Sequence, residues 1–120
     1  MQPTTQRLAV ATVVLAEDSH PTAEMVFGAT REILPSVSQA TVYNTLNRFV
    51  EAGLLVPVDV PGRATRFDPR VDHHHHLYDV DSGELMDLDP DDLSVTLSDE
   101  ALQAYDVERV RIRVDVRRRD

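Results

Sequence analysis

Apolar residues recur at helical spacing through the first third of the chain, with turn signals between the helical stretches. Residues 6–16 form an apolar run that predicts a buried helix, although its β-branched residues leave a strand open as an alternative. Residues 17–21, which end in His-Pro, break this run. Thr22 can then cap a second, amphipathic helix, which the apolar spacing continues as far as Pro35.

A third helix is predicted from Ser38, a typical N-cap residue, to Gly53, a typical helix stop. One face of this helix is apolar and contains Val42, Leu46, Phe49 and Val50. The opposite face is polar and contains Gln39, Tyr43, Asn44, Asn47 and Glu51. Such a helix is anchored by its apolar stripe while its polar side remains exposed.

After Gly53 the apolar residues recur at every second position, which predicts a β-hairpin. Residues 55–60 and 63–68 alternate as strands do, and Pro61-Gly62 between them is a turn signal. Three helices followed by a hairpin is the order of elements in a winged helix-turn-helix. The polar face of the third helix can then read base edges in the major groove, while hairpin arginines contact phosphate or the minor groove.

The second half of the chain has a different pattern. Residues 73–80 and 84–88 flank a turn signal at 81–83, which predicts a second hairpin. Residues 98–104 predict a short capped helix, and residues 110–116 alternate as a half-buried strand. Two or three antiparallel strands with one short helix form too small a lobe to be stable alone. We therefore expect sheet pairing across a dimer to complete it.

The predicted fold class is α+β, with an N-terminal winged helix-turn-helix in residues 1–68 and a small C-terminal α/β dimerisation lobe in residues 69–120. At 120 residues each lobe buries little surface, which favours a homodimer. No apolar run approaches the roughly 20 residues that span a bilayer, and the N-terminus lacks the pattern of a signal peptide. We expect no membrane partner and a cytoplasmic location.

The net charge of −9 at first argues against a nucleic-acid partner, because phosphate contacts need cations. The acidic residues are concentrated in the second half of the chain. Residues 1–66 contain five arginines and six acidic residues, whereas residues 67–120 contain seven arginines and fifteen acidic residues. All twelve basic residues are arginine, a bias that genome composition explains more often than function does. The sequence has no cysteine, so any metal must bind to nitrogen and oxygen.

Four consecutive histidines, His73 to His76, are the main candidate for chemistry. On an extended strand, His73 and His75 face one side, and His74 and His76 face the other. Either pair can provide two imidazole nitrogens to a zinc, iron or manganese ion, with carboxylates completing the site. The competing interpretation, a solvated loop with incidental metal affinity, is about as frequent for a bare histidine tract. For His20 alone, a hydrogen-bonded loop histidine is the more frequent interpretation.

Three blocks of sequence resemble the ferric uptake regulator (Fur) family in their order along the chain. They are HPTAEMVF, SQATVYNTLNRFVEAGLL, and RFDPRVDHHHHLY followed by GELMDLD. The chain is most similar to the iron response regulator (Irr) branch, because Asn44 stands where most members have arginine and the histidine segment has no cysteine. The resemblance implies a winged helix, a dimerisation lobe and metal at their junction.

The resemblance also implies which residues bind metal. The sensory site for a divalent iron, manganese or zinc ion would comprise His20, Asp68, His74, His76 and Asp87. His73 and His75 would point toward a second metal site or a haem. Residues 79–82 are Asp-Val-Asp-Ser where many members have Cys-x-x-Cys, so a cysteine-bound structural zinc is excluded. Haem is implied as an alternative signal, ranked below metal because a His-x-His pair does not distinguish the two.

The recognition helix of the family meets DNA through Tyr43 and neighbouring positions. The expected contacts are Ser38, Thr41, Tyr43 and Asn44, with Arg48, Arg63 and Arg66 as weaker candidates. Tyr43 has an alternative role, in which its ring packs against the preceding helix.

The sequence therefore predicts a homodimeric regulator that binds double-stranded operator DNA, controls iron-homeostasis genes and responds to metal or haem. The alternative is a metal- or haem-binding protein whose winged helix contacts protein instead of DNA, which the acidity of the chain favours. An enzyme is a distant third, because no nucleophile motif, phosphate loop or defined general base accompanies the histidines.

Overall fold

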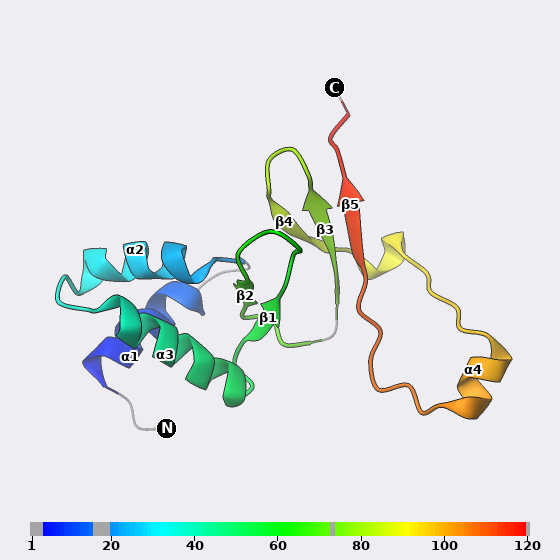
Figure 1. Cartoon of the computed structure of the whole chain (residues 1–120), viewed down its shortest axis with the longest axis horizontal. Helices are drawn as coiled ribbons and strands as arrows, with labels where there is room; N and C mark the ends of the chain where they lie inside the picture. Colours follow the sequence, from blue (N-terminus) through cyan, green and yellow to red (C-terminus); the bar gives the residue numbers. More distant parts are fainter. Residues whose placement is uncertain (1–3, 16–19, 73, 120) are drawn as a thin grey trace. The chain divides into compact units, whose positions relative to one another are not determined.

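The computed structural model describes residues 4–15, 20–72 and 74–119 and divides into two compact units (Figure 1). The N-terminal unit is Met1–Val71 and the C-terminal unit is Asp72–Asp120, so the division falls slightly later than the predicted boundary after residue 68. Among the described residues, no helix is long and apolar enough to cross a membrane.

The N-terminal unit has the expected order of three helices and a hairpin. Its elements are α1 (Thr5–Val14), α2 (Ala23–Ile33), α3 (Gln39–Glu51), β1 (Val56–Val58) and β2 (Arg66–Asp68). The first segment is a helix, so the strand alternative is wrong. The winged-helix prediction is confirmed.

Local capping explains where these helices begin and end. The hydroxyls of Thr4, Thr22 and Ser38 each accept the backbone N–H three residues later, which satisfies an otherwise unpaired donor at the helix start. After α3, Gly53 adopts a φ of 77°, a left-handed conformation that glycine takes without steric strain. The caps predicted at Thr22 and Ser38 and the stop predicted at Gly53 are therefore the ones that the structure uses, whereas the cap at Thr4 was not predicted.

The core of the N-terminal unit comes from one face of each helix and from the hairpin. Its fully buried members include Val10, Val14, Val26, Val42, Leu46 and Leu55, with Phe49 and Phe67 nearly so. Because Val42, Leu46 and Phe49 turn inward, the opposite face of α3 is left exposed.

The wing strands β1 and β2 pair antiparallel, with Val56 opposite Asp68. The segment before α2 runs alongside β2, because the backbone N–H of Phe67 donates to the carbonyl of Pro21 at 2.9 Å and Thr22 bridges Arg66. This pairing brings two segments that are distant in sequence, the end of the α1–α2 connection and the wing, next to each other.

The C-terminal unit contains β3 (His75–Asp79), β4 (Leu85–Leu88), the 3₁₀ helix η1 (Pro90–Asp92), α4 (Asp99–Ala104) and β5 (Arg113–Val116). The strand order is β4-β3-β5. The β3–β4 hairpin is antiparallel as predicted, but β5 pairs parallel to β3, so the expectation of an antiparallel sheet is wrong. The long connection through η1 and α4 is a crossover of the length that parallel pairing requires (Figure 1).

Candidate functional site

His20 and Asp68 form a buried pair within the N-terminal unit. Their Nε2 and Oδ2 atoms lie 3.2 Å apart, and both side chains are almost entirely enclosed. The other oxygen of Asp68, Oδ1, accepts the backbone N–H of Arg70 at 2.9 Å. Asp68 is therefore held by its own turn, with one oxygen directed to His20.

His20 is held in place by two contacts with the wing. The β2 strand pairs with the residues that follow His20, and Arg66 Nη1 donates to the His20 carbonyl at 3.1 Å. Arg66 is half-buried in this role. The arginine that the sequence suggested as a weak DNA contact thus also fixes the backbone of a candidate metal ligand.

His74, His76 and Asp87 converge within the C-terminal unit. Asp87 Oδ1 lies 3.0 Å from His74 Nε2 and 3.5 Å from His76 Nε2. The hairpin register sets His76 opposite Asp87, and His74 lies two residues earlier on the same side. The two imidazole rings meet edge to face, with centroids 4.6 Å apart.

The protonation pattern of His74 favours a cation beside Asp87. His74 Nδ1 lies 2.7 Å from the carbonyl oxygen of Asp72, which can only accept, so Nδ1 carries the proton. In a neutral imidazole, Nε2 then has a lone pair, and this lone pair faces a carboxylate oxygen at 3.0 Å. Two acceptors at that distance repel unless a proton or a metal ion lies between them. A histidine that binds metal through one nitrogen usually donates the other N–H to a carbonyl in this way.

His75 has a different environment. Its Nδ1 accepts the backbone N–H of Ile112 at 3.0 Å, just before β5. Nδ1 is therefore occupied, and a neutral ring carries its proton on Nε2. In this arrangement His75 holds the start of β5 and has no nitrogen lone pair to offer a metal. His73, the other residue predicted for a second metal or haem site, lies outside the described residues.

The donor chemistry of both groups suits a first-row divalent ion. Each of the five side chains, His20, Asp68, His74, His76 and Asp87, offers one ligand atom. Nitrogen and oxygen ligands bind zinc at about 2.0–2.2 Å, so two ligands of one ion are about 3 to 3.5 Å apart. The separations within each unit, 3.0 to 3.5 Å, match that spacing.

The exposed face of α3 carries most of the residues predicted to contact DNA. Tyr43 is 43% exposed, and Asn44 and Arg48 are exposed beside it. Ser38 caps the helix and also donates to Thr41 Oγ1 at 2.8 Å. On the wing, Arg63 is exposed at the hairpin turn.

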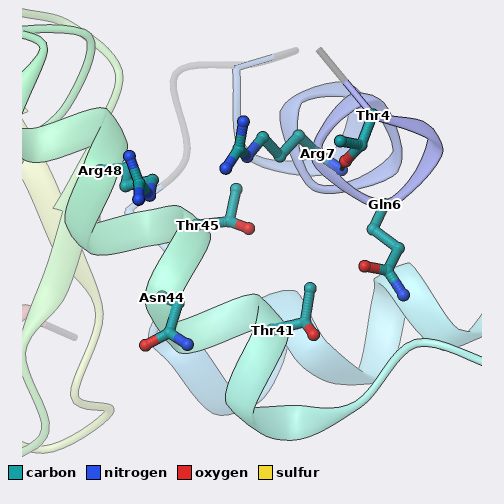
Figure 2. Close-up of a pocket in the computed structure, with 7 residues that line it drawn as sticks. All are labelled: Thr4, Gln6, Arg7, Thr41, Asn44, Thr45 and Arg48. Carbon is teal, nitrogen blue, oxygen red and sulfur yellow. Dashed lines mark hydrogen bonds between the residues drawn. The ribbon is translucent and has the colours of Figure 1, made fainter. Parts of the chain in front are cut away.

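A polar hollow beside this face was not predicted. It lies between α3 and the start of α1, and it includes Thr4, Gln6 and Arg7 among its lining residues (Figure 2). The sequence offered one signal, a cap residue followed at helical spacing by an arginine, but periodicity did not indicate which part of α3 these residues would face.

The fold is that of a winged helix with a small α/β lobe, and each unit carries a histidine–carboxylate group. A model of the ferric uptake regulator family matches residues 1–117. The chain therefore belongs to the ferric uptake regulator family.

Curated relatives agree with this membership. The chain is 31% identical over 85 residues to the peroxide-responsive repressor PerR of Staphylococcus epidermidis, covering 71% of this chain and 57% of that protein. It is 39% identical over 80 residues to the transcriptional regulator FurA of Mycobacterium bovis, covering 64% of this chain and 54% of that protein. The matched segments thus span little more than half the length of these relatives.

Solved structures share the fold over nearly the whole chain. The ferric uptake regulator of Pseudomonas aeruginosa with manganese has a TM-score of 0.74 at 26% identity, covering 100% of this chain and 92% of that one. The regulator of Francisella tularensis with iron has a TM-score of 0.78 at 19% identity, covering 98% and 91%. A zinc-bound manganese uptake regulator has a TM-score of 0.71 at 24% identity, covering 97% and 91%.

Proposed function

We propose that this chain is a metal-responsive DNA-binding transcriptional regulator that acts as a homodimer and controls iron-homeostasis genes. Family membership and the repressor and regulator names of its relatives support this function. In this proposal the predicted domain of residues 1–68 binds operator DNA, and residues 69–120 dimerise and sense the ligand.

The proposed sensory site binds one divalent ion through His20, Asp68, His74, His76 and Asp87. The observation that carries this proposal is the orientation of His74, whose Nδ1 is held by the Asp72 carbonyl while Nε2 faces Asp87. Imidazole and carboxylate donors suit manganese, iron and zinc, the ions named with the related structures. Haem ranks below a metal ion as the ligand, because the Nδ1 atom of His75 already accepts the backbone N–H of Ile112.

A bound ion would act by binding two conformations unequally, since a ligand shifts an equilibrium only by its difference in affinity. His20 lies before α2 of the DNA-binding unit, whereas His74, His76 and Asp87 belong to the hairpin of the other unit. An ion shared by these residues would therefore restrict how the DNA-binding unit is presented to the operator.

Within the family, we assign the chain to the Irr branch. Asn44 on the exposed face of α3 and the Asp79–Ser82 turn in place of Cys-x-x-Cys support this finer assignment. The relatives named above belong to other groups of regulators, so the assignment depends on these residues alone.

The direct test measures DNA binding with and without metal. Operator-like duplexes are first selected from a randomised pool, and their affinity for the purified chain is then measured by fluorescence anisotropy with Mn²⁺ or with a chelator, at several salt concentrations. We expect Mn²⁺ to change the Kd for the selected duplex by about tenfold or more, a coupling typical of allosteric regulators. The double variant His74→Ala and His76→Ala should lose this change.

His75→Gln is the matched control, because glutamine keeps an acceptor for the Ile112 N–H. It should retain the metal response, and an equal loss in both variants would contradict the assignment of His74 and His76. Weak binding that is equal for all duplexes in every metal state would overturn the regulator function. That outcome would favour a metal-binding protein whose winged helix contacts protein, in line with the net charge of −9.

A further inference from the structure

Residues 89–108, all within the described part of the chain, follow β4 and include no buried side chain. We call this segment the acidic arm. Leu93 and Ala101 are half-buried, and every other residue of the arm is exposed. Five of the exposed side chains are large and apolar, namely Val95, Leu97, Leu102, Tyr105 and Val107, and the exposure of Tyr105 reaches 72%. Apolar surface of this extent usually marks a contact with a partner.

The charge of the acidic arm has one sign. The arm contains seven acidic residues and no basic residue. Within residues 4–15, 20–72 and 74–119, no ion pair involves any of these carboxylates. A surface that complements the arm should therefore combine arginine or lysine with apolar side chains.

The next residues along the chain combine these two properties. Residues 109–119, which include β5, contain six arginines and one acidic residue, and we call them the arginine segment. Arg109 and Arg111 are exposed, line an open hollow of about 520 Å³ and have no ion pair among the described residues. The half-buried side chains of Val110 and Ile112 alternate with them.

The arginine segment is anchored to β3, so it forms an ordered surface. The backbone N–H of Ile112 donates to His75 Nδ1 at 3.0 Å, and the Ile112 carbonyl accepts the backbone N–H of His76 at 3.1 Å. In the strand order β4-β3-β5, the outer edge of β5 has no neighbour among the described strands. This edge is therefore open to a second chain.

The acidic arm and the arginine segment complement each other in charge and in apolar character. We propose that the acidic arm of one chain packs on the arginine segment of a second copy of this chain. Two-fold symmetry then forms the same contact twice in one dimer. This inference rests on the homodimer of the proposed function, and it identifies which two surfaces of the C-terminal unit meet.

The test uses two charge-reversed variants of the full chain. One combines Glu100→Arg with Asp106→Arg in the arm, and the other combines Arg109→Glu with Arg111→Glu in the segment; all four positions are exposed. The dimer dissociation constant is measured by analytical ultracentrifugation. Each variant alone should dimerise at least tenfold more weakly than wild type, because like charges then meet in both copies of the contact.

An equimolar mixture of the two variants should recover a dimer of near wild-type affinity. In the mixed dimer the basic arm of one chain meets the acidic segment of the other, and the second contact joins an unchanged arm to an unchanged segment. Recovery in the mixture distinguishes contact between chains from an arm that folds back on its own segment.

The apolar part of the contact is tested with Tyr105→Ala. We expect the dimer to weaken about tenfold or more, because aromatic anchors contribute most of the affinity of protein interfaces. Ile33→Ala is the matched control, since Ile33 is an apolar residue of the N-terminal unit that is 55% exposed, and it should dimerise as wild type.

Wild-type dimerisation by Tyr105→Ala or by either charge-reversed variant, or a mixture that does not recover the dimer, would overturn this inference and leave the homodimer in place. A wild type that stays monomeric at the concentrations at which it binds DNA would instead overturn the homodimer of the proposed function. In that case the acidic arm contacts something other than a second copy of the chain.

Discussion

Asp79 closes the β3–β4 turn and thereby sets the register of the candidate metal ligands. Its Oδ1 accepts the backbone N–H groups of Asp81 and Ser82, at 2.9 and 3.2 Å, and Arg118 lies 3.4 Å from its Oδ2. The N–H of Ser82 and then that of Asp81 are the main reasons that the pKa of Asp79 is lowered from its ordinary 3.8. A carboxylate thus orders a turn where many family members have cysteine.

This turn gives a prediction about acid stability. Because the folded pKa of Asp79 is lowered, its contribution to stability is complete above the unfolded value of 3.8 and is lost as the pH falls through the folded value. Asp79→Asn should therefore destabilise the protein at pH 7, and the difference from wild type should shrink below about pH 4. Urea unfolding at pH 7 and below about pH 4, monitored by circular dichroism, measures the free energy of unfolding of both proteins.

Asp81→Asn is the control for that experiment, since Asp81 is exposed and its carboxylate forms an exposed ion pair with Arg117 at 3.4 Å. It should change stability little at either pH. A constant difference between Asp79→Asn and wild type across the pH range would contradict a role for the charge of Asp79.

Part of the candidate site could be predicted from residue types alone. Strand alternation places His74 and His76 on one side, and a tight turn after β3 brings Asp87 opposite His76. The role of the Asp72 carbonyl could not be predicted, because the direction of a carbonyl at a bend is not specified by its side chain. The contact between His75 and Ile112 depends on β5, which returns from far along the chain.

At the scale of elements, α3 begins at a residue with two proposed roles. Ser38 accepts the Thr41 N–H at 3.1 Å as an N-cap, and it also lies at the edge of the proposed DNA-reading face. A single loss-of-function variant would not separate these roles, but the choice of replacement can. Aspartate preserves the cap acceptor and adds a negative charge, whereas alanine removes the cap.

Ser38→Ala should lower the free energy of unfolding by about 1 kcal/mol, as loss of a cap typically does. Ser38→Asp should keep or raise stability and still weaken operator binding about tenfold or more, because its charge would face phosphate. Ser98→Asp, the same change at the N-cap of α4, is the control and should bind as wild type. Operator binding by Ser38→Asp at wild-type affinity would remove this end of α3 from the interface.

The helices were more predictable than the sheet, and β5 shows why. Its alternation of exposed and half-buried residues was visible in the sequence, and the strand exists. Its partner was not predictable, because the connection from β4 to β5 holds no two-residue turn that would dictate a hairpin. Strand periodicity specifies which face is buried, whereas the neighbour in the sheet depends on the path of the whole connection.

At the scale of the whole molecule, charge is divided between the two units. Residues 1–71 hold six arginines against seven acidic residues, and residues 72–120 hold six against fourteen. The acidity that argues against DNA binding therefore belongs to the C-terminal unit. Exposed charges are screened beyond about 8 Å at physiological salt, so nearby exposed cations such as Arg48 and Arg63 decide whether the N-terminal unit attracts phosphate.

Metal stoichiometry tests whether the histidine–carboxylate groups of the two units bind the same ion. If they share one, the wild type binds a single Mn²⁺ per chain, and Asp68→Asn and Asp87→Asn each weaken it about tenfold or more. The double variant of Asp68→Asn and Asp87→Asn should then bind Mn²⁺ only slightly more weakly than either single variant, because both changes affect one site. Isothermal titration with Mn²⁺ measures affinity and stoichiometry, and Asp106→Asn, an exposed carboxylate outside both groups, is the control. Two ions per chain, with Asp68→Asn losing only one of them, would show that each unit binds its own metal and that coordination does not link them.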